Sequence, residues 1–481
     1  MSHTIRDDQL AGLPREAREI ILALLEQNRR LQARVAELEA RLGITPQNSS
    51  LPPSSTHPHA KPPSKKPSSK GPQKRRGGQP GHAKHERPLI PSADCQEVIP
   101  LKPDACRQCG TALAGEDAAP LRHQVWELPV IKPIVTEYQR HRLICPCCST
   151  STCAPLPPGV PTGQSGPRLI ALVALLMAYF RQSKSRTALF LEALLGQPCS
   201  TGLTIKHQNI ATAALRPNYE ELKAALPQQP RLGGDESPTK QAQAKAWVWT
   251  FVAVNFTVFG VRCTRAATVL KEFLGSFRGI INCDRAKMYW RLGWETGDAP
   301  CQHSLQWCWA HLKRDFQKLI DSSDNQAKRL GHDLMRQTEQ LFHHWSRCRD
   351  GTITRATLKR ELQPIRYRVE GLLLRGMFSN NPRLTGMCQE LYHHRSWLWK
   401  FLDSDGVEPT NNASERSLRH AVIWRKLSFG TQSESGSRFV ETMLTVIETC
   451  RQQKRNVFAH VTAAIEAHLA GQAAPSLQPG A

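Results

Sequence analysis

Hydrophobic positions near the start of the chain repeat with the spacing of a helix that packs against a partner helix. The seam positions alternate three and four residues apart, at Ile21, Leu24, Asn28, Leu31, Val35, Leu38 and Leu42. This spacing predicts a coiled coil over residues 1–44, in which Asn28 would fix the register and favour two strands. Because the seam covers only about three heptads, an amphipathic helix packed on its own protein is the alternative.

Apolar periodicity ends after residue 44, and proline and serine dominate the next segment. Ten of the 34 prolines fall between Pro52 and Pro91. Such a composition buries too little apolar surface to fold, so residues 45–92 are predicted to be a disordered linker. The basic residues of its stretch 61–76 have no acid between them and are predicted to contact phosphates of DNA without reading base sequence. They include Lys65, Lys66, Lys74, Arg75 and Arg76.

Helical periodicity returns between residues 169 and 226, with a short break at Ser200-Thr201-Gly202. Two helices separated by such a break resemble a helix-turn-helix, and a plain helical hairpin fits the pattern equally well. Residues 161–228 are therefore predicted to form a helical DNA-binding segment.

From Arg231 the apolar pattern changes from helical to strand-like. The runs RLGGDE, AWVWTFVAV and FGVRCT predict three strands, and a helical KEFLGSF and a fourth strand, GIINCD, follow. This order is the opening of a ribonuclease-H-like α/β fold, in which the first and fourth strands lie side by side. We predict such a catalytic core over residues 229–455, a helical insertion at about 316–400, and a C-terminal helix and tail over residues 456–481.

Three carboxylates fall where this fold would bring them together. Asp235 and Asp284 end, or directly follow, the first and fourth strands, and Glu415 lies at the start of a later helix. Carboxylate oxygens are the ligands that Mg²⁺ prefers, and two such ions can stabilise an in-line phosphoryl displacement. Each residue also has a structural alternative. Asp235 would be a turn residue, Asp284 a helix cap, and Glu415 the third residue of a capping box begun by Asn412.

Two cysteine pairs have the spacing of zinc-binding knuckles. Cys106 and Cys109 form the first pair, and Cys145 and Cys148 form the second. Four thiolates close a tetrahedral site and leave no position for chemistry, so one structural Zn²⁺ is predicted in a zinc-ribbon-like finger over residues 93–160. Strands are expected at residues 125–130 and 134–144. Cys147 could replace a neighbour, Cys95 and Cys153 are spare, and reduced structural cysteines are the alternative.

Composition narrows the class of partner. Lysine plus arginine number 64 against 41 acids, which gives a net charge of +23 and favours polyanions such as nucleic acid. The longest apolar stretch, residues 169–180, is shorter than the about 20 residues that span a bilayer. The polar, acid-containing start MSHTIRDDQL predicts no signal peptide. Fifteen clustered cysteines suggest metal ligation in a reducing cytoplasm. We therefore expect a cytoplasmic, multidomain α+β protein that does not bind membranes.

Several motifs, in order, resemble the TnpC-type DDE transposases of the bacterial insertion-sequence-sixty-six family. They are the N-terminal zipper, NSSLPPSS, RRGGQPGH, the two cysteine knuckles, FRGIINCDRAKMYW, QWCWAHLKRDF and PTNNASERSLRHAVIWRKLSFGTQSESG. The resemblance covers nearly the whole chain. It implies that Asp235, Asp284 and Glu415 are the catalytic residues and the ligands of two Mg²⁺ ions per active site. The chain departs from the family pattern at GGDES, where glycines precede the first aspartate.

The resemblance further implies cleavage of DNA at insertion-sequence ends and strand transfer into target DNA. It also implies a homodimer or higher oligomer, small accessory proteins encoded by the same element, and a bacterial, nucleoid-associated location. Contacts to DNA are expected from His311, Arg416, Arg419, Arg425 and Lys426, with charge on a helix surface as the alternative for each. Trp307 and Trp309 are expected in the core. Two other functions fit parts of the sequence: a zinc-finger, coiled-coil DNA-binding regulator without catalysis, and a ribonuclease-H-like nuclease that does not join strands.

Overall fold

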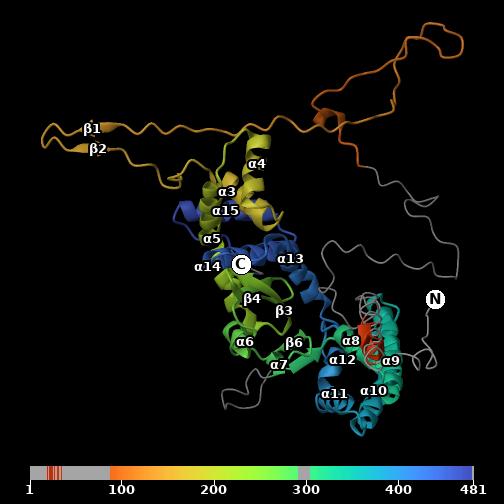
Figure 1. Cartoon of the computed structure of the whole chain (residues 1–481). Coiled ribbons are helices and arrows are strands. Elements are labelled where there is room, and N and C mark those ends of the chain that lie inside the picture. The colour runs from red at the N-terminus through yellow and green to blue at the C-terminus, as the bar shows by residue number, and fades with distance from the viewer. Residues whose placement is uncertain are drawn as a thin grey trace. The chain divides into compact units, whose positions relative to one another are not determined.

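The computed structural model describes residues 87–290 and 304–478, together with residues 19, 21–24, 26–27, 30–31 and 34. Contacts divide the chain into two compact units, residues 60–135 and residues 1–59 with 136–481. The division falls inside the segment 93–160 that was predicted to be one finger, so each unit is described by itself (Figure 1).

The described residues between Glu19 and Arg34 are helical, as the heptad pattern predicts. The seam residues Leu24 and Leu31 are each 58% exposed. Asn28, Val35 and the later seam positions, like the linker lysines and arginines at residues 65–76, lie outside the described residues. The partner helix of the coiled coil therefore stays a prediction.

A five-stranded mixed sheet lies at the centre of the larger unit, with the strand order β5-β4-β3-β6-β7 (Figure 1). The bounds are β3 Arg231–Gln241, β4 Ala244–Val252, β5 Thr257–Arg262, β6 Ile280–Cys283 and β7 Ser304–Trp307. β3, β4 and β5 pair antiparallel, whereas β3, β6 and β7 pair parallel. The prediction that the first and fourth strands of this region are neighbours is confirmed.

Asp235 does not end its strand, and it is not a turn residue after the two glycines. β3 continues to Gln241 because β4 pairs with it along its whole length, with Asp235 opposite Thr250. Both of those expectations for Asp235 were wrong. Asp284, in contrast, directly follows β6, as predicted.

The outer edge of the sheet is covered by helix α14, Glu434–Gln452. Alternate N–H groups of β5 donate to side chains spaced four residues apart on α14. The pairs are Thr257 N to Thr449 Oγ1 (3.2 Å), Phe259 N to Thr445 Oγ1 (2.9 Å) and Val261 N to Glu441 Oε2 (2.9 Å). A free strand edge invites pairing with other chains, and here the helix occupies its donors.

Glu441 is a fully buried carboxylate that joins α14 to the sheet and to a neighbouring helix. It pairs with Arg216 (2.8 Å), Arg262 (3.0 Å) and Arg438 (3.2 Å). Because a buried charge is tolerated only when it is paired and hydrogen-bonded, this network accounts for Glu441 as a structural residue. It is not one of the three carboxylates predicted to bind metal.

Further helices pack on α14, on one another or on the sheet. They are α3 Pro167–Ala178, α4 Lys184–Leu195, α5 Thr201–Ala224, α13 Asn412–Ser428 and α15 Val457–Leu469. α5 contacts α3, α14 and α15, while α13 lies on β3 and β4. The break before α5 is confirmed, since Ser200 caps that helix by accepting a hydrogen bond from Leu203 N at 3.1 Å. The segment therefore belongs to the same compact unit as the sheet.

A helical insertion connects β7 to α13, as predicted, and Figure 1 shows its long helices side by side. Its elements are α8 Trp309–Ile320, α9 Asn325–Arg349, α10 Arg355–Met377, α11 Pro382–His393, η4 Arg395–Leu398 and α12 Lys400–Asp403. The insertion begins before residue 316, because α8 directly follows β7. Gln306 and Trp309 fix its return by donating to Leu398 O at 3.2 and 2.8 Å.

The shorter elements are η2 Ser92–Asp94, β1 Arg142–Ile144, β2 Ser151–Cys153, η3 Leu226–Gln228, α6 Ala267–Leu274 and α7 Lys287–Trp290. The strand predicted at residues 125–130 is absent, and only the end of the one at 134–144 forms, as β1. Both predictions were wrong in extent. Apolar residues alternate there, but Val125 (80% exposed) and Ile134 (97% exposed) have no sheet to pack on. Among the described residues, no helix is long and apolar enough to span a bilayer.

Helix α13 approaches β3 so closely that a side chain would not fit at the contact. A Cβ atom on Gly233 would lie 2.2 Å from Ser414 Oγ, and one on Gly234 would lie 3.1 Å from the Tyr289 ring. Asn411, which precedes α13, donates from Nδ2 to Gly234 O at 2.7 Å. Gly233 of GGDES thus permits the helix to dock on the strand, and Gly234 leaves room for the Tyr289 ring.

We expect Gly233→Ala to destabilise the protein by about 1–3 kcal/mol, the usual cost of overpacking a close contact. Urea unfolding measures the change. Gly371→Ala on α10 is the matched control, because no atom lies within 4 Å of its added Cβ and helical alanine is favoured by roughly 0.5–1 kcal/mol. Equal stability of Gly233→Ala and wild type would contradict the close approach of α13.

Candidate functional site

Two aspartates lie at the same edge of the sheet. The parallel pairing of β3 with β6 places Gly233 opposite Asn282. Asp235 and Asp284 each follow two residues later, so their positions correspond along the two strands. Asp284 accepts a hydrogen bond from Ala286 N at 2.8 Å, and Asp235 accepts one from Glu236 N at 2.9 Å. The bond from Ala286 N is the kind of contact expected if Asp284 capped the helix after β6, so the helix-cap alternative accounts for this one contact.

Glu415 reaches this edge on the first turns of α13. Asn411 positions the helix start, since its N–H donates to Cys308 Sγ at 3.2 Å and its side chain donates to β3. Burial raises the pKa of Asp235 well above its usual value, and the negative charges of Glu236, Asp284 and Glu415 add to the shift. The three predicted carboxylates thus form one electrostatic group.

Glu415 does not form a capping box. The residue that precedes α13 is Asn411 rather than Asn412, and its side chain makes no cap hydrogen bond. Glu415 Oε1 is buried, and no hydrogen bond reaches it from the described part of the chain. A buried carboxylate oxygen without a donor is costly, and a bound cation would remove that cost.

His311 and Cys308 are close to Glu415. One ligand atom from each of these three residues lies within 4.8 Å of the others, and His311 Nδ1 lies 3.6 Å from Glu415 Oε1. Burial lowers the pKa of His311, and it raises the pKa of Cys308 to about 11. Cys308 therefore stays a neutral thiol, which is a poor ligand for a hard cation such as Mg²⁺.

A fourth acid at the site, Glu236, was missed by the sequence analysis. Its side chain is 2% exposed, pairs with Arg265 and accepts a hydrogen bond from Tyr289 Oη at 2.8 Å. Burial and the charge of Asp284 raise its pKa to about 7. Glu236 directly follows Asp235 on β3, so the two side chains point to opposite faces of the sheet. The side chain of Glu236 faces Tyr289. The one signal for Glu236 in the sequence is its position directly after Asp235 in GGDES.

The basic residues predicted to contact DNA differ in their surroundings. Arg416 and Arg419 are exposed on α13, and Lys426 is half-buried. Arg425 donates to Ser237 Oγ at 3.2 Å and to Pro238 O, so its guanidinium is engaged within the protein. Trp307 and Trp309 are fully buried, which confirms that they belong to the core.

The two cysteine pairs have the same backbone conformation. In the smaller unit, Cys106 N donates to Thr111 O at 2.8 Å and Gly110 N donates to Cys106 O at 2.9 Å. In the larger unit, Cys145 N donates to Thr150 O at 2.9 Å and Ser149 N donates to Cys145 O at 2.9 Å. Gly110 and Ser149 have matching left-handed φ angles of 74° and 55°. Each pair therefore forms the same tight turn.

The second thiol of each pair is activated by a threonine hydroxyl. Thr111 Oγ1 lies 3.3 Å from Cys109 Sγ, and this contact lowers the pKa of Cys109 to about 7. Thr150 lies 3.2 Å from Cys148 and lowers its pKa in the same way. Thiolates are the form that binds zinc, so both turns are suited to a metal.

Comparison with known families gives three matches. A model described as Transposase IS66 family matches residues 162–438, more than half of the chain. A second, the zinc-finger binding domain of transposase IS66, matches residues 103–149 and includes all four predicted zinc ligands. The third, a family of unknown function (DUF6444), matches residues 6–88.

Three similar proteins come from Sinorhizobium fredii (strain NBRC 101917 / NGR234), and each is described as uncharacterized. The chain is 23% identical to y4hP over 76% of its own length and 70% of that protein. It is 25% identical to y4qI over 45% of its length and 42% of that protein. It is 26% identical to y4jO over 31% of its length and 44% of that protein. The chain thus spans less than half of the latter two.

Without divalent cations, we expect Asp235→Asn to raise the melting temperature at pH 8. The raised pKa means that the folded state holds this proton more tightly than the unfolded chain. Asp235 therefore stabilises the fold at low pH and loses that contribution as pH rises. Each kcal/mol of relieved repulsion would raise the melting temperature by roughly 2–4 °C.

The difference in melting temperature between Asp235→Asn and wild type should shrink as pH falls toward 4. Added Mg²⁺ should raise the melting temperature of wild type more than that of the variant. Melting curves with chelator and with Mg²⁺ measure both effects. A variant that melts below wild type in chelator at pH 8 would show that Asp235 makes a net stabilising contact.

We expect one zinc per chain by elemental analysis, with Cys109→Ser losing it because a hydroxyl is a weak zinc ligand. Cys147→Ser should keep the metal, which separates Cys147 from Cys148 as the ligand. Cys263→Ser is the control, because Cys263 is an exposed thiol outside both turns. Native protein without zinc would rule the site out.

Proposed function

The chain belongs to the transposase IS66 family, and on that basis we propose that Asp235, Asp284 and Glu415 are its catalytic carboxylates. The protein is therefore a DDE-type DNA transposase with a zinc-finger domain. The observation that carries the residue assignment is the electrostatic group at the sheet edge, where Asp235 is coupled to Asp284 and Glu415. The family implies a divalent metal, and we take it to be Mg²⁺.

The donor set fits that cation. The three residues supply only hard carboxylate oxygens, and Glu415 Oε1 has no hydrogen-bond donor in the described part of the chain. When bound, two Mg²⁺ ions would supply Lewis-acid stabilisation of the attacking and leaving oxygens. Asp235 and Asp284 would hold the ions on the rigid sheet, and Glu415 would close the site from α13.

The reaction consists of two displacements at phosphorus. In the first, water attacks a phosphodiester at the element end, and the bond to the 3′-oxygen breaks to leave a 3′-hydroxyl. In the second, that hydroxyl attacks a target phosphodiester, a new P–O bond forms, and a target 3′-hydroxyl leaves. In each step the attacking oxygen loses a proton to solvent, and the leaving 3′-oxygen takes one up from solvent. A regulator would perform neither step, and a nuclease would perform only the first.

Three further assignments belong to this proposal. The strand order β5-β4-β3-β6-β7, with only β4 antiparallel to the others, supports a ribonuclease-H-like core. The repeated turns support one structural Zn²⁺ held by Cys106, Cys109, Cys145 and Cys148. The exposed seam residues Leu24 and Leu31 support a coiled-coil dimer, which suits an enzyme that must hold two DNA ends.

The test is Glu415→Gln assayed with Mg²⁺ on DNA carrying the element ends. We expect normal folding and DNA binding, but a loss of nicking and joining of at least about a hundredfold, because an amide oxygen neutralises none of the cation's charge. Glu408→Gln is the matched control, since Glu408 is an exposed acid shortly before α13. Retained strand transfer by Glu415→Gln would refute the assignment, and nicking without joining by wild type would favour a nuclease.

A further inference from the structure

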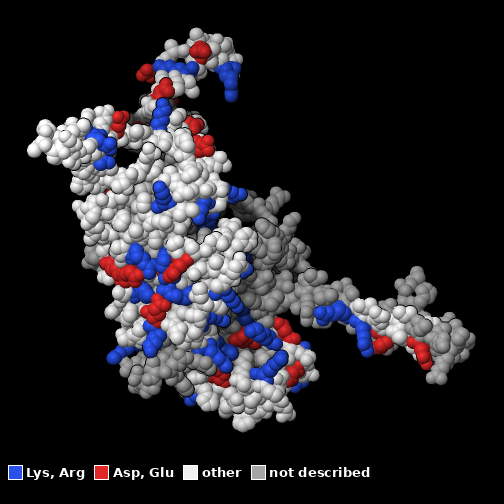
Figure 2. Space-filling model, turned by 60° about the vertical axis from the view of Figure 1, so that its left-hand side comes forward, with Lys and Arg blue, Asp and Glu red and all other residues white. Residues whose placement is uncertain are grey.

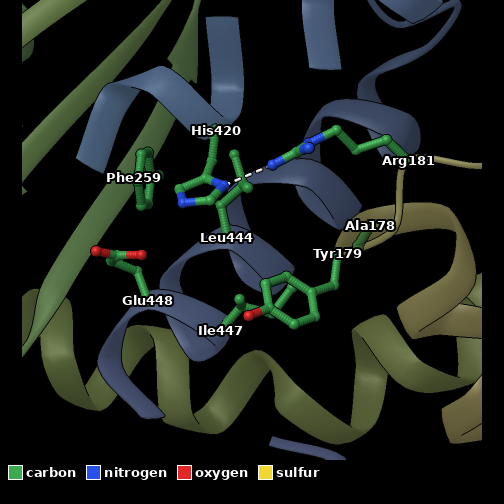
Figure 3. A pocket seen from close by; sticks show the side chains of 8 residues that line it. All are labelled: Ala178, Tyr179, Arg181, Phe259, His420, Leu444, Ile447 and Glu448. Atoms are coloured by element: carbon green, nitrogen blue, oxygen red, sulfur yellow. Dashed lines mark hydrogen bonds between the residues drawn. The ribbon is translucent and has the colours of Figure 1, made fainter. Parts of the chain in front are cut away.

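A cluster of charged residues lies where three helices meet above the sheet (Figure 3). Arg181 follows α3, His420 lies on α13, and Glu448 lies on α14, with Phe259 of β5 beside them. Arg451, one turn along α14, reaches the same histidine. The cluster is separate from the carboxylates at the sheet edge.

His420 meets hydrogen-bond donors on both sides. Arg181 Nη2 lies 2.6 Å from its Nδ1, and Arg451 Nη1 lies 2.8 Å from its Nε2. A guanidinium has only donors, and a neutral imidazole has a single acceptor nitrogen. One of the two contacts must therefore bring two N–H groups together, and protonation of the ring would make both contacts repulsive.

The positive charge here is only partly balanced. Arg451 pairs with Glu448 at 2.7 Å, but neither Arg181 nor the neighbouring Arg419 has a carboxylate partner within the described ranges. Figure 2 shows acidic side chains interspersed with the basic ones on the face drawn. Burial lowers the pKa of His420, and the charges of Arg451, Arg181 and Arg419 lower it further.

We propose that Arg181, His420 and Arg451 form a binding site for a backbone phosphate of DNA. Two oxygens of one phosphate would accept from the two guanidinium groups. The phosphate would draw one guanidinium off the ring, and that ring nitrogen could then donate to it, which removes the contact between donors. Arginine is suited to this because its planar fork binds phosphate through two hydrogen bonds.

The position of the cluster fits a strand that passes the catalytic site, and this placement rests on the proposed function. His420 lies five residues after Glu415 on the same helix, a rise of about 7.5 Å and a turn of about 140° around its axis, so the strand would follow the helix surface from one to the other. Arg181 belongs to the helical segment before the sheet. One phosphate would therefore connect that segment to the helix that carries the catalytic glutamate.

The first experiment measures binding of a labelled 20-base-pair duplex without added Mg²⁺ at several salt concentrations, so that the structural zinc is kept. Arg181→Gln should weaken binding about tenfold and lower the slope of log K against log salt by about 0.9, the value for one lost phosphate contact. Arg336→Gln on α9 is the control, because Arg336 is exposed and pairs with Asp333 at 3.5 Å. Equal slope changes in both variants would reflect net charge alone and overturn the proposal.

A second readout is proton uptake, measured by calorimetry in two buffers of different ionisation enthalpy. A bound phosphate should let His420 accept a proton, so wild type should take up more protons at pH 6.5 than His420→Gln. The groups facing this ring are Arg181 and Tyr179 from the end of α3, Arg451 and Glu448 from α14, and Arg419 from α13. Equal proton uptake by the two proteins would contradict the role of His420.

Two further measurements decide between the remaining outcomes. Arg181→Lys keeps the positive charge, so it should keep the slope of log K against log salt. It is the variant to measure if Arg181→Gln fails to fold. Inorganic phosphate that stabilises wild type but not Arg181→Gln, with an unchanged salt slope on DNA, would make this a free-anion site and overturn the DNA assignment. No Mg²⁺ is added and no cleavage is scored, so these results do not depend on the catalytic carboxylates.

Discussion

The docking of α13 on β3 is the contact on which the candidate active site depends. Two aspartates on neighbouring parallel strands are brought together by the sheet itself, but the third acid comes from a helix far along the chain. Gly233 leaves room for Ser414, and Asn411 fixes the start of the helix by donating to Gly234 O. Glu415 is coupled to Asp235 because these small and polar contacts hold the helix against the strand.

The helical insertion between β7 and α13 must return the chain to the sheet without disturbing this contact. Asn282 Nδ2 donates to Glu408 O and Thr410 O at 2.8 and 2.9 Å, and Trp309 N donates to Pro409 O at 2.9 Å. The returning segment is thus tied to β6 and to the first residue of α8. An insertion can vary in length at small entropic cost when its two ends are fixed in this way.

Local patterns in the sequence predicted the first four strands from Arg231 onward, the position of Asp284, and the helical character of the insertion, but not β7. They did not predict Glu236 as a partner of Arg265 and Tyr289, or Asn411 as the anchor of α13. The Asn411 contact joins residues 177 positions apart, and no short-range periodicity encodes it. The strand predicted at residues 125–130 failed for the opposite reason: apolar alternation is present, but no neighbouring strand completes the pairing.

Anomalous X-ray diffraction from crystals grown with MnCl₂ would test the central claim most directly, because Mn²⁺ binds oxygen ligands like those of Mg²⁺ and its position can be observed. The account predicts density about 2.1 Å from carboxylate oxygens of Asp235, Asp284 and Glu415. Manganese bound by Cys308, His311 and Glu415, with neither aspartate as a ligand, would contradict it.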